Sequence, residues 1–139
     1  MTSDDDPASR AGRRSRTAGP REWQALVRTR ANVLVHGNRR ALDAFLEAVR
    51  PILREPVSIV ACTPALALAE ASTIVLNDVE RLDQAGQRAL RTWIADERHA
   101  ESQIIALTVK SLFALVEKGL FDRELYYMVN TIYLPLPRA

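Results

Sequence analysis

Apolar residues along this chain fall into short continuous runs, separated by stretches with helical spacing. Residues 73–76 (Thr-Ile-Val-Leu) form the most informative run, and the polar residues Asn77 and Asp78 follow it. A continuous run of this kind is typical of a strand buried on both faces, as in a parallel sheet. Helical spacing then resumes, with Asp83 suited to cap a helix that buries Leu90. The polar pair therefore ends a predicted buried strand.

The same two patterns alternate along the rest of the chain. Apolar runs predict further strands at residues 32–36, 57–62, 103–107 and 131–134. Helical spacing predicts helices over residues 20–30, 42–49, 83–96, 112–116 and 122–129, and the Ala- and Leu-rich residues 64–71 are expected to be helical as well. Strands that alternate with helices predict an α/β fold of three layers, with a parallel sheet between helices on both faces.

Composition indicates the class of protein and the cellular compartment that we expect. The chain has 139 residues, 47% apolar residues and a formal net charge of +2, as expected for one globular domain with a core of its own. Its lone cysteine, Cys62, excludes an intramolecular disulfide and a cysteine-rich metal site. No signal-peptide pattern or membrane-length apolar stretch is present, so we expect a cytoplasmic protein that does not associate with a membrane.

Residues 1–19 are predicted to be a disordered tail and residues 20–139 the folded domain. The tail carries three aspartates at 4–6 and four arginines between Arg10 and Arg16, with no residues able to form a core. An arginine-rich arm can contact phosphates. A solvated tail is the favoured interpretation, so nucleic acid is not an expected partner.

In a parallel sheet, ligands bind at the carboxyl ends of the strands. The residues predicted to lie there follow three different strands: Gly37 and its neighbours, the pair Asn77 and Asp78, and Thr108. This edge is the candidate site.

Two longer motifs resemble a known family. Residues 119–130 (GLFDRELYYMVN) are similar to the G-x-F-R-x-D-L-Y-Y-R-L-N motif of the AAA+ domain of bacterial sigma-54-dependent transcription activators. Residues 72–94 resemble that family's Walker B strand and the helix after it, and the similarity extends over roughly residues 21–137. The resemblance implies a P-loop NTPase sheet of the AAA+ type. Because the chain ends at Ala139, it also implies a domain that lacks the family's C-terminal helical lid.

The resemblance places a phosphate-binding loop after the first strand, but its chemistry is altered. The motif G-x-x-x-x-G-K-[ST] wraps phosphates with backbone N–H groups, a lysine and a hydroxyl. With Gly37 as the first glycine, residues 42–44 (Leu-Asp-Ala) replace Gly-Lys-Ser/Thr, and Asp43 is expected to repel a phosphate. Arg39 and Arg40 are the only cations near this turn that could compensate.

The other nucleotide-binding positions are altered as well. Asn77 replaces the family's magnesium-orienting aspartate, and Asp78 replaces its glutamate; we expect Asp78 to cap nearby backbone instead. Val109 replaces the sensor asparagine, which leaves only Thr108 there. The arginine-finger positions fall on Asp122 and Met128. Arg123, one residue beyond the first, could be a displaced finger, but pairing with a carboxylate on the helix surface is the favoured interpretation.

The resemblance therefore favours a module that no longer hydrolyses ATP, with no cofactor, and acts by protein–protein interaction in transcription regulation. The expected partner is an AAA+ activator or a signalling protein, or a second copy of the chain in a homo-oligomer. The expected contact surface consists of Phe121, Arg123, Tyr126, Tyr127 and Asn130. The alternative is a weak ATP- and Mg²⁺-binding domain that uses Arg39, Arg40 and Asp78 and is completed by a partner.

Overall fold

Five parallel strands form the central sheet of the computed structural model, which describes residues 19–62 and 66–139. The predicted tail lies outside the described residues, except for Gly19. The strands are β1 (Val33–His36), β2 (Val57–Ala61), β3 (Thr73–Asn77), β4 (Gln103–Thr108) and β5 (Ile132–Pro135), in the spatial order β2-β3-β4-β1-β5. Every neighbouring pair is parallel. The sequence prediction of a parallel sheet is confirmed.

One helix precedes β1, and helices connect β1 to β2, β3 to β4 and β4 to β5. The α-helices are α2 (Pro20–Arg28), α3 (Arg39–Val49), α4 (Gln84–Ala95), α5 (Leu112–Glu117) and α6 (Arg123–Val129). Short 3-10 helices are η2 (Arg50–Ile52), η3 (Val79–Arg81) and η4 (Glu97–His99). Side chains of Asn38, Asp83, Ser111 and Asp122 each accept a hydrogen bond from the first turn of the helix that follows, so local sequence fixes where four of these helices begin.

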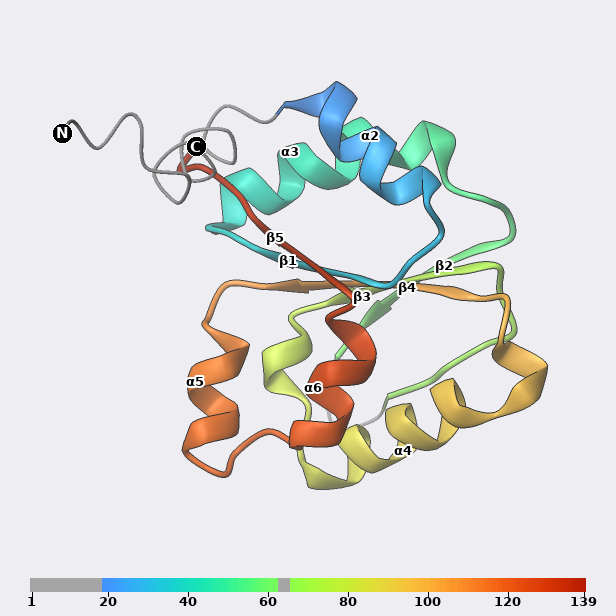
Figure 1. Ribbon diagram of the computed structural model, residues 1–139, viewed down its shortest axis with the longest axis vertical. Helices are drawn as coiled ribbons and strands as arrows, with labels where there is room; N and C mark the ends of the chain where they lie inside the picture. The colour runs from blue at the N-terminus through green and yellow to red at the C-terminus, as the bar shows by residue number, and fades with distance from the viewer. Residues whose placement is uncertain (1–18, 63–65) are drawn as a thin grey trace, which may run out of the picture.

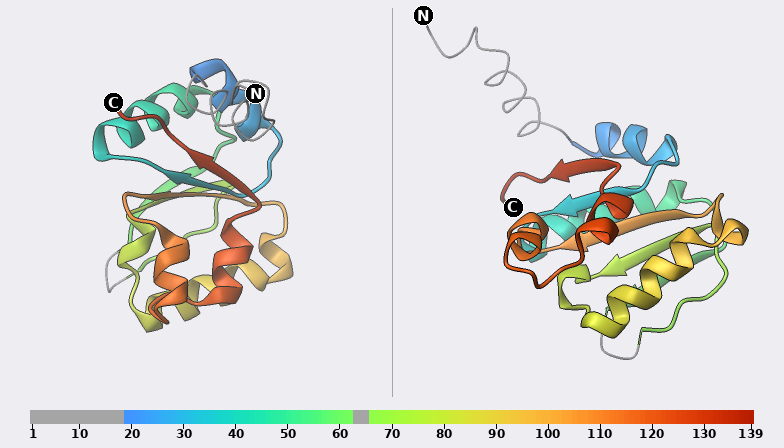
Figure 2. Two further views of the ribbon diagram at one scale, coloured as in Figure 1. Left: turned by 60° about the vertical axis from the view of Figure 1, so that its left-hand side comes forward. Right: turned by 60° about the horizontal axis from the view of Figure 1, so that its bottom comes forward.

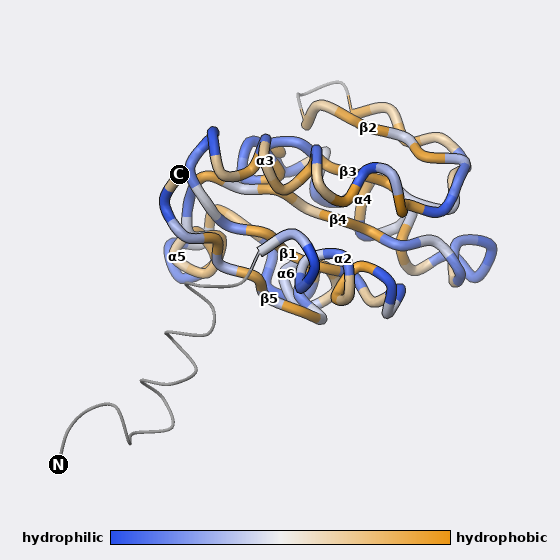
Figure 3. Tube along the Cα trace, turned by 90° about the horizontal axis from the view of Figure 1, so that it is seen from above, coloured by the Kyte–Doolittle hydropathy of each residue, from blue (hydrophilic) through white to orange (hydrophobic). Residues whose placement is uncertain are grey.

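The molecule has three layers. Helices α2 and α3 cover one face of the sheet, and α4, α5 and α6 cover the other (Figure 1); the two views in Figure 2 agree. Along β1, Val33 and Val35 belong to one buried cluster and Leu34 to the other, as the alternation of side chains in a strand requires. Figure 3 shows the strands as largely hydrophobic tubes, as expected for strands covered on both sides.

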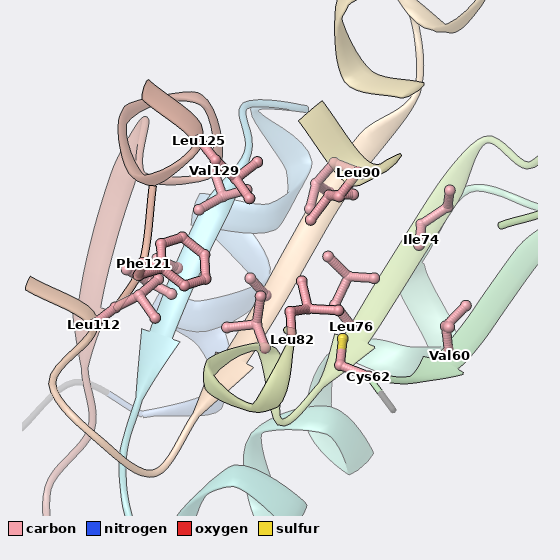
Figure 4. Close-up of a cluster of buried hydrophobic side chains, with 14 of the residues drawn as sticks. Val60, Cys62, Ile74, Leu76, Leu82, Leu90, Leu112, Phe121, Leu125 and Val129 are labelled. Carbon is pink, nitrogen blue, oxygen red and sulfur yellow. The ribbon is translucent and has the colours of Figure 1, made fainter. Parts of the chain in front are cut away.

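Two hydrophobic cores result. On the α2–α3 side, Trp23 packs against Phe45 with 5.7 Å between ring centroids. On the other side, Leu90 of α4 and Leu125 of α6 pack over β3 and β4 (Figure 4). Cys62 is 1% exposed within this second core.

Arg30 connects the amino ends of β3 and β4. Its backbone adopts φ +68°, which ends α2 two residues before the predicted boundary. Its guanidinium donates to Thr73 Oγ1 and Gln103 Oε1, and to the carbonyl oxygens of Ser72 and Glu101, at 2.7–3.2 Å. One side chain thereby satisfies acceptors at the starts of β3 and β4.

The prediction of a helix over residues 64–71 is wrong for the described part, residues 66–71, which contains no helix. Leu66, Leu68 and Ala71 instead pack partly against the core of the α4–α6 side. Tertiary contacts therefore override the high helix propensity of Ala and Leu. Residues 64 and 65 lie outside the described residues.

Candidate functional site

The strand order brings the predicted site residues to one edge of the sheet. Strand β4 lies between β3 and β1, so their carboxyl ends are neighbours. The backbone N–H of Gly37 donates to the carbonyl oxygen of Thr108 at 3.1 Å. Gly37, Asp78 and Thr108 therefore lie at the same edge, as predicted.

The turn after β1 is short, and its groups already have partners within the protein. Strand β1 ends at His36 and α3 begins at Arg39, so only two residues form the turn. The side chain of Asn38 accepts a hydrogen bond from the N–H of Ala41 at 2.8 Å. A Cβ atom added at Gly37 would lie 3.1 Å from the Cβ of Leu136, which explains why glycine fits here.

The segment after β5 covers this turn. The N–H of Leu136 donates to the carbonyl oxygen of His36 at 2.8 Å, and the amide of Asn38 donates to the carbonyl oxygen of Ala139 at 3.3 Å. Residues 39–44, which would form the rest of a phosphate-binding loop, lie within α3. Their conformation is that of a helix and not of a loop that surrounds an anion.

Asp43 lies in the second turn of α3. It is exposed on α3 and lines a hollow of about 440 Å³ together with Glu47 and Arg50. The expectation that Asp43 would repel a phosphate stays a prediction, since Asp43 lies one helical turn after Arg39 on α3.

Asp78 pairs with Arg39. The guanidinium of Arg39 donates to Asp78 Oδ1, and the two side chains are 48% and 29% exposed. Asp78 adopts the left-handed conformation, φ +59° and ψ +51°, at the start of η3, where its side chain makes no capping hydrogen bond. The prediction that Asp78 caps backbone is wrong, because the ion pair takes up its carboxylate.

The remaining predicted site residues differ in whether they are buried and hydrogen-bonded or exposed to a ligand. Thr108 is fully buried; its hydroxyl donates to the carbonyl oxygen of Lys110 at 2.8 Å and accepts from the Lys110 N–H. Its hydroxyl is thus taken up by the turn after β4. Asn77 ends β3, and its carbonyl oxygen accepts from the N–H of Cys62. Arg40 is exposed at the start of α3.

The second group of predicted residues lies around α6, and Phe121 must be removed from it. Phe121 is 3% exposed and belongs to the core of the α4–α6 side (Figure 4), so its side chain cannot be a surface contact. Tyr127, in contrast, is 60% exposed. Tyr126 lies between Tyr127 and Phe113 of α5, at ring-centroid distances of 5.4 and 6.1 Å.

Arg123 is exposed, but the carboxylates beside it pair with another arginine. Arg91 of α4 lies 3.3 Å from Asp122 and 3.9 Å from Glu124. The predicted pairing of Arg123 with a carboxylate is therefore not among the ion pairs of the described residues. Asn130 ends α6 half-buried, and its Oδ1 has no hydrogen-bond partner among those residues.

The described residues contain neither a candidate metal cluster nor a membrane-length apolar helix. No group of three or more His, Cys, Asp or Glu side chains there could hold a metal ion. None of the helices within residues 19–62 and 66–139 is long and apolar enough to cross a membrane.

A comparison with known protein families shows to which family this chain belongs. The sigma-54 interaction domain family matches residues 30–138. The chain belongs to this family. This sigma-54 interaction domain also resembles transcription regulators along part of its length. It is 30% identical over 79 residues to the HTH-type transcriptional regulatory protein TyrR of Salmonella typhimurium and 29% identical to that of Citrobacter braakii.

The match to TyrR involves 50% of this chain and only 15% of the relative. Solved structures agree on the fold. NtrX from Brucella abortus, crystallised with ATP, superposes with a TM-score of 0.67 at 15% identity, over 94% of this chain and 40% of NtrX. The P-loop NTPase domain of a sigma-54 transport activator from E. coli gives 0.57 at 24% identity, over 82% and 93%.

Sequence reasoning missed several residues that shape the site. Asn38 could have been found, since an asparagine directly before a helix is a capping signal. The covering of Gly37 by Leu136 could not, because it joins residues about a hundred positions apart. The pairing of Arg39 with Asp78, which are 39 positions apart, could not be predicted either.

Proposed function

We propose that this sigma-54 interaction domain no longer hydrolyses ATP and acts in transcription regulation by binding another protein. The observation that carries the proposal is the two-residue turn between β1 and α3. A triphosphate requires a longer loop whose N–H groups surround the phosphates, together with a lysine and a metal-binding hydroxyl. Phosphoryl transfer depends almost entirely on such positioning and charge stabilisation.

The ion pair at the same edge supports the proposal. Arg39 and Asp78 neutralise each other, so an incoming Mg²⁺–nucleotide would have to separate them. Asn77 brings no charge to Mg²⁺, a cation that favours carboxylates. The hydroxyl of Thr108 is already hydrogen-bonded within its turn.

One observation favours the alternative, a weak ATP-binding domain completed by a partner. Arg39 and Arg40 are exposed at the start of α3, and the amino end of a helix attracts anions. The two proposed functions predict different affinities for ATP and ADP, and these affinities can be measured.

Calorimetric and thermal-shift titrations of the full chain with ATP and ADP, with and without Mg²⁺, distinguish them. We expect no saturable binding up to about 1 mM nucleotide, a concentration that corresponds to roughly 4 kcal/mol of binding free energy. Saturable binding at micromolar nucleotide that is lost in the double variant Arg39→Ala/Arg40→Ala would overturn the proposal. Arg50→Ala, which removes an exposed arginine just after α3, is the matched control.

The surface proposed for a protein partner consists of Phe113, Tyr126 and Tyr127, with Arg123 beside them on α6. Exposed aromatic and arginine side chains are enriched among residues that dominate binding energy. Phe113 and Tyr127 are 46% and 60% exposed, although large aromatic rings of this kind usually pack in a core. The proposed partner is an AAA+ activator or signalling protein, or a second copy of the chain.

A photo-crosslinking amino acid at position 127 tests this surface. We expect cross-links at 127 to a defined partner, and few from the same probe at Ile59, which is 37% exposed on the edge strand β2. Sedimentation of the purified chain distinguishes a second copy from a different protein. Equal cross-linking from both positions, or unchanged binding by a Phe113→Ala/Tyr127→Ala variant, would exclude this surface.

A further inference from the structure

His99 forms a cluster of contacts at the end of α4, away from the candidate site. Its side chain is 4% exposed, and its ring stacks on Trp93 with 3.7 Å between centroids and 7° between planes. His99 Nε2 lies 2.6 Å from Glu70 Oε2, and His99 Nδ1 lies 2.7 Å from the carbonyl oxygen of Trp93. Each ring nitrogen therefore faces an oxygen.

The two oxygens determine the charge of the ring. A carboxylate and a carbonyl oxygen accept hydrogen bonds but do not donate them. A neutral imidazole carries a single N–H, so it can satisfy only one of these contacts, whereas an imidazolium satisfies both. The geometry thus selects the protonated form of His99.

On balance, the surrounding groups also favour the protonated form of His99. Burial alone would lower the pKa of His99, but the hydrogen bonds to Glu70 and to the Trp93 carbonyl, and the negative charges of Glu70 and Asp96, raise it. Two cations lie nearby. Arg98 is held 2.8 Å from Asp96, and Arg88 lines the same hollow of about 510 Å³ as His99.

Glu70 belongs to the segment that joins β2 to β3. In this segment Leu66 and Leu68 pack only partly against the core, and the carbonyl oxygen of Ala71 accepts from Ser102 Oγ at 2.6 Å. The side chain of Glu70 is 73% exposed. His99 is thus held in place by its packing, whereas the exposed side chain of Glu70 can move away from it.

We propose that protonated His99 is a latch that holds residues 66–71 against the end of α4 and opens when His99 loses its proton. Deprotonation leaves the ring a single N–H, which we expect to remain on Nδ1 with the Trp93 carbonyl oxygen, so that the contact with the exposed Glu70 breaks. Because the pKa of His99 is raised in the folded state, the hold is complete below the ordinary histidine pKa of about 6.5 and is lost as pH rises through the folded value.

Nitrogen-detected NMR of the histidine rings is the first test. The chain has two histidines, so His36 supplies an internal reference for assignment. We expect His99 to titrate above the ordinary histidine pKa of about 6.5 in the wild-type chain, and its titration to move to lower pH in Glu70→Gln. A His99 titration at or below the ordinary histidine value, or an unchanged titration in Glu70→Gln, would overturn the proposal.

Hydrogen exchange tests the movement of the segment itself. Glu70→Gln should accelerate amide exchange in residues 66–71 by about two- to fivefold at pH 7, the size expected for a largely exposed ion pair. Glu97→Gln makes the same change of charge at an exposed residue of η4 and should leave that exchange unchanged. If both variants exchange alike while remaining folded by circular dichroism, the contact does not hold the segment.

Discussion

Asp78 combines two constraints that mutation can separate. Its backbone lies at φ +59°, a conformation that costs most residues other than glycine about 1–2 kcal/mol. Its carboxylate pairs with Arg39. Asp78→Gly and Asp78→Ala both remove the ion pair, but only alanine also strains the backbone. We therefore expect Asp78→Ala to unfold at lower urea, with a free energy of unfolding about 1 kcal/mol below that of Asp78→Gly.

The same pair of substitutions at Arg81 is the control. Arg81 is exposed within η3, where the backbone is helical and alanine is favoured over glycine. The order of stability should therefore reverse at this position. If alanine is the more stable substituent at both positions, the left-handed conformation of Asp78 is not a constraint in solution.

Gln87 joins two elements, α4 and the loop that leads into α6. Its amide Nε2 donates to the carbonyl oxygens of Leu82 and Leu120, and its Oε1 accepts from the N–H of Asp122, all at 2.8–3.0 Å. Gln87 is 7% exposed, so Gln87→Leu would leave these three backbone groups without partners. We expect chemical denaturation to show a loss of about 1–3 kcal/mol in the free energy of unfolding.

An exposed glutamine one turn earlier provides the comparison. Gln84→Leu changes the same atoms in the first turn of α4, where the side chain is exposed, and should alter stability by no more than about 0.5 kcal/mol. Equal effects of the two substitutions would mean that the buried hydrogen bonds of Gln87 do not stabilise the junction.

The elements themselves were largely predictable from sequence, for a physical reason. A strand buried on both faces, such as β3, requires a continuous apolar run, and a cap such as Asp83 requires a particular side chain at one position. Both signals are local. Residues 66–71 were mispredicted because their conformation depends on distant contacts, among them Glu70 with His99.

At the scale of the whole molecule, topology explains which parts of the candidate site were foreseen. A parallel sheet places the carboxyl ends of β1, β3 and β4 together, which was enough to group Gly37, Asp78 and Thr108. Side-chain partners across the fold were not predictable, because one sequence does not specify which helix surface faces which strand end. Phe121 illustrates this, since its motif suggested a surface and its packing makes it core.

Cys62 provides a probe of the stability of this whole arrangement. Burial, together with the charges of Asp78 and Glu80, raises the pKa of the Cys62 thiol to about 12, and the side chain is 1% exposed. A thiol reagent attacks only an accessible thiolate, so labelling at pH 8 requires the protein to open. We expect labelling to be at least about a thousandfold slower than in the urea-unfolded chain, as measured by mass spectrometry over time.

The dependence of this labelling on urea identifies which opening exposes Cys62. If the core of the α4–α6 side must unfold, the logarithm of the labelling rate should rise linearly with urea concentration, with the slope of global unfolding. Asp78→Ala should then label faster than Asp78→Gly by about fivefold, the factor equivalent to 1 kcal/mol. Rapid labelling that is independent of urea would instead locate a small local opening at the end of β2, where the N–H of Cys62 donates to Asn77.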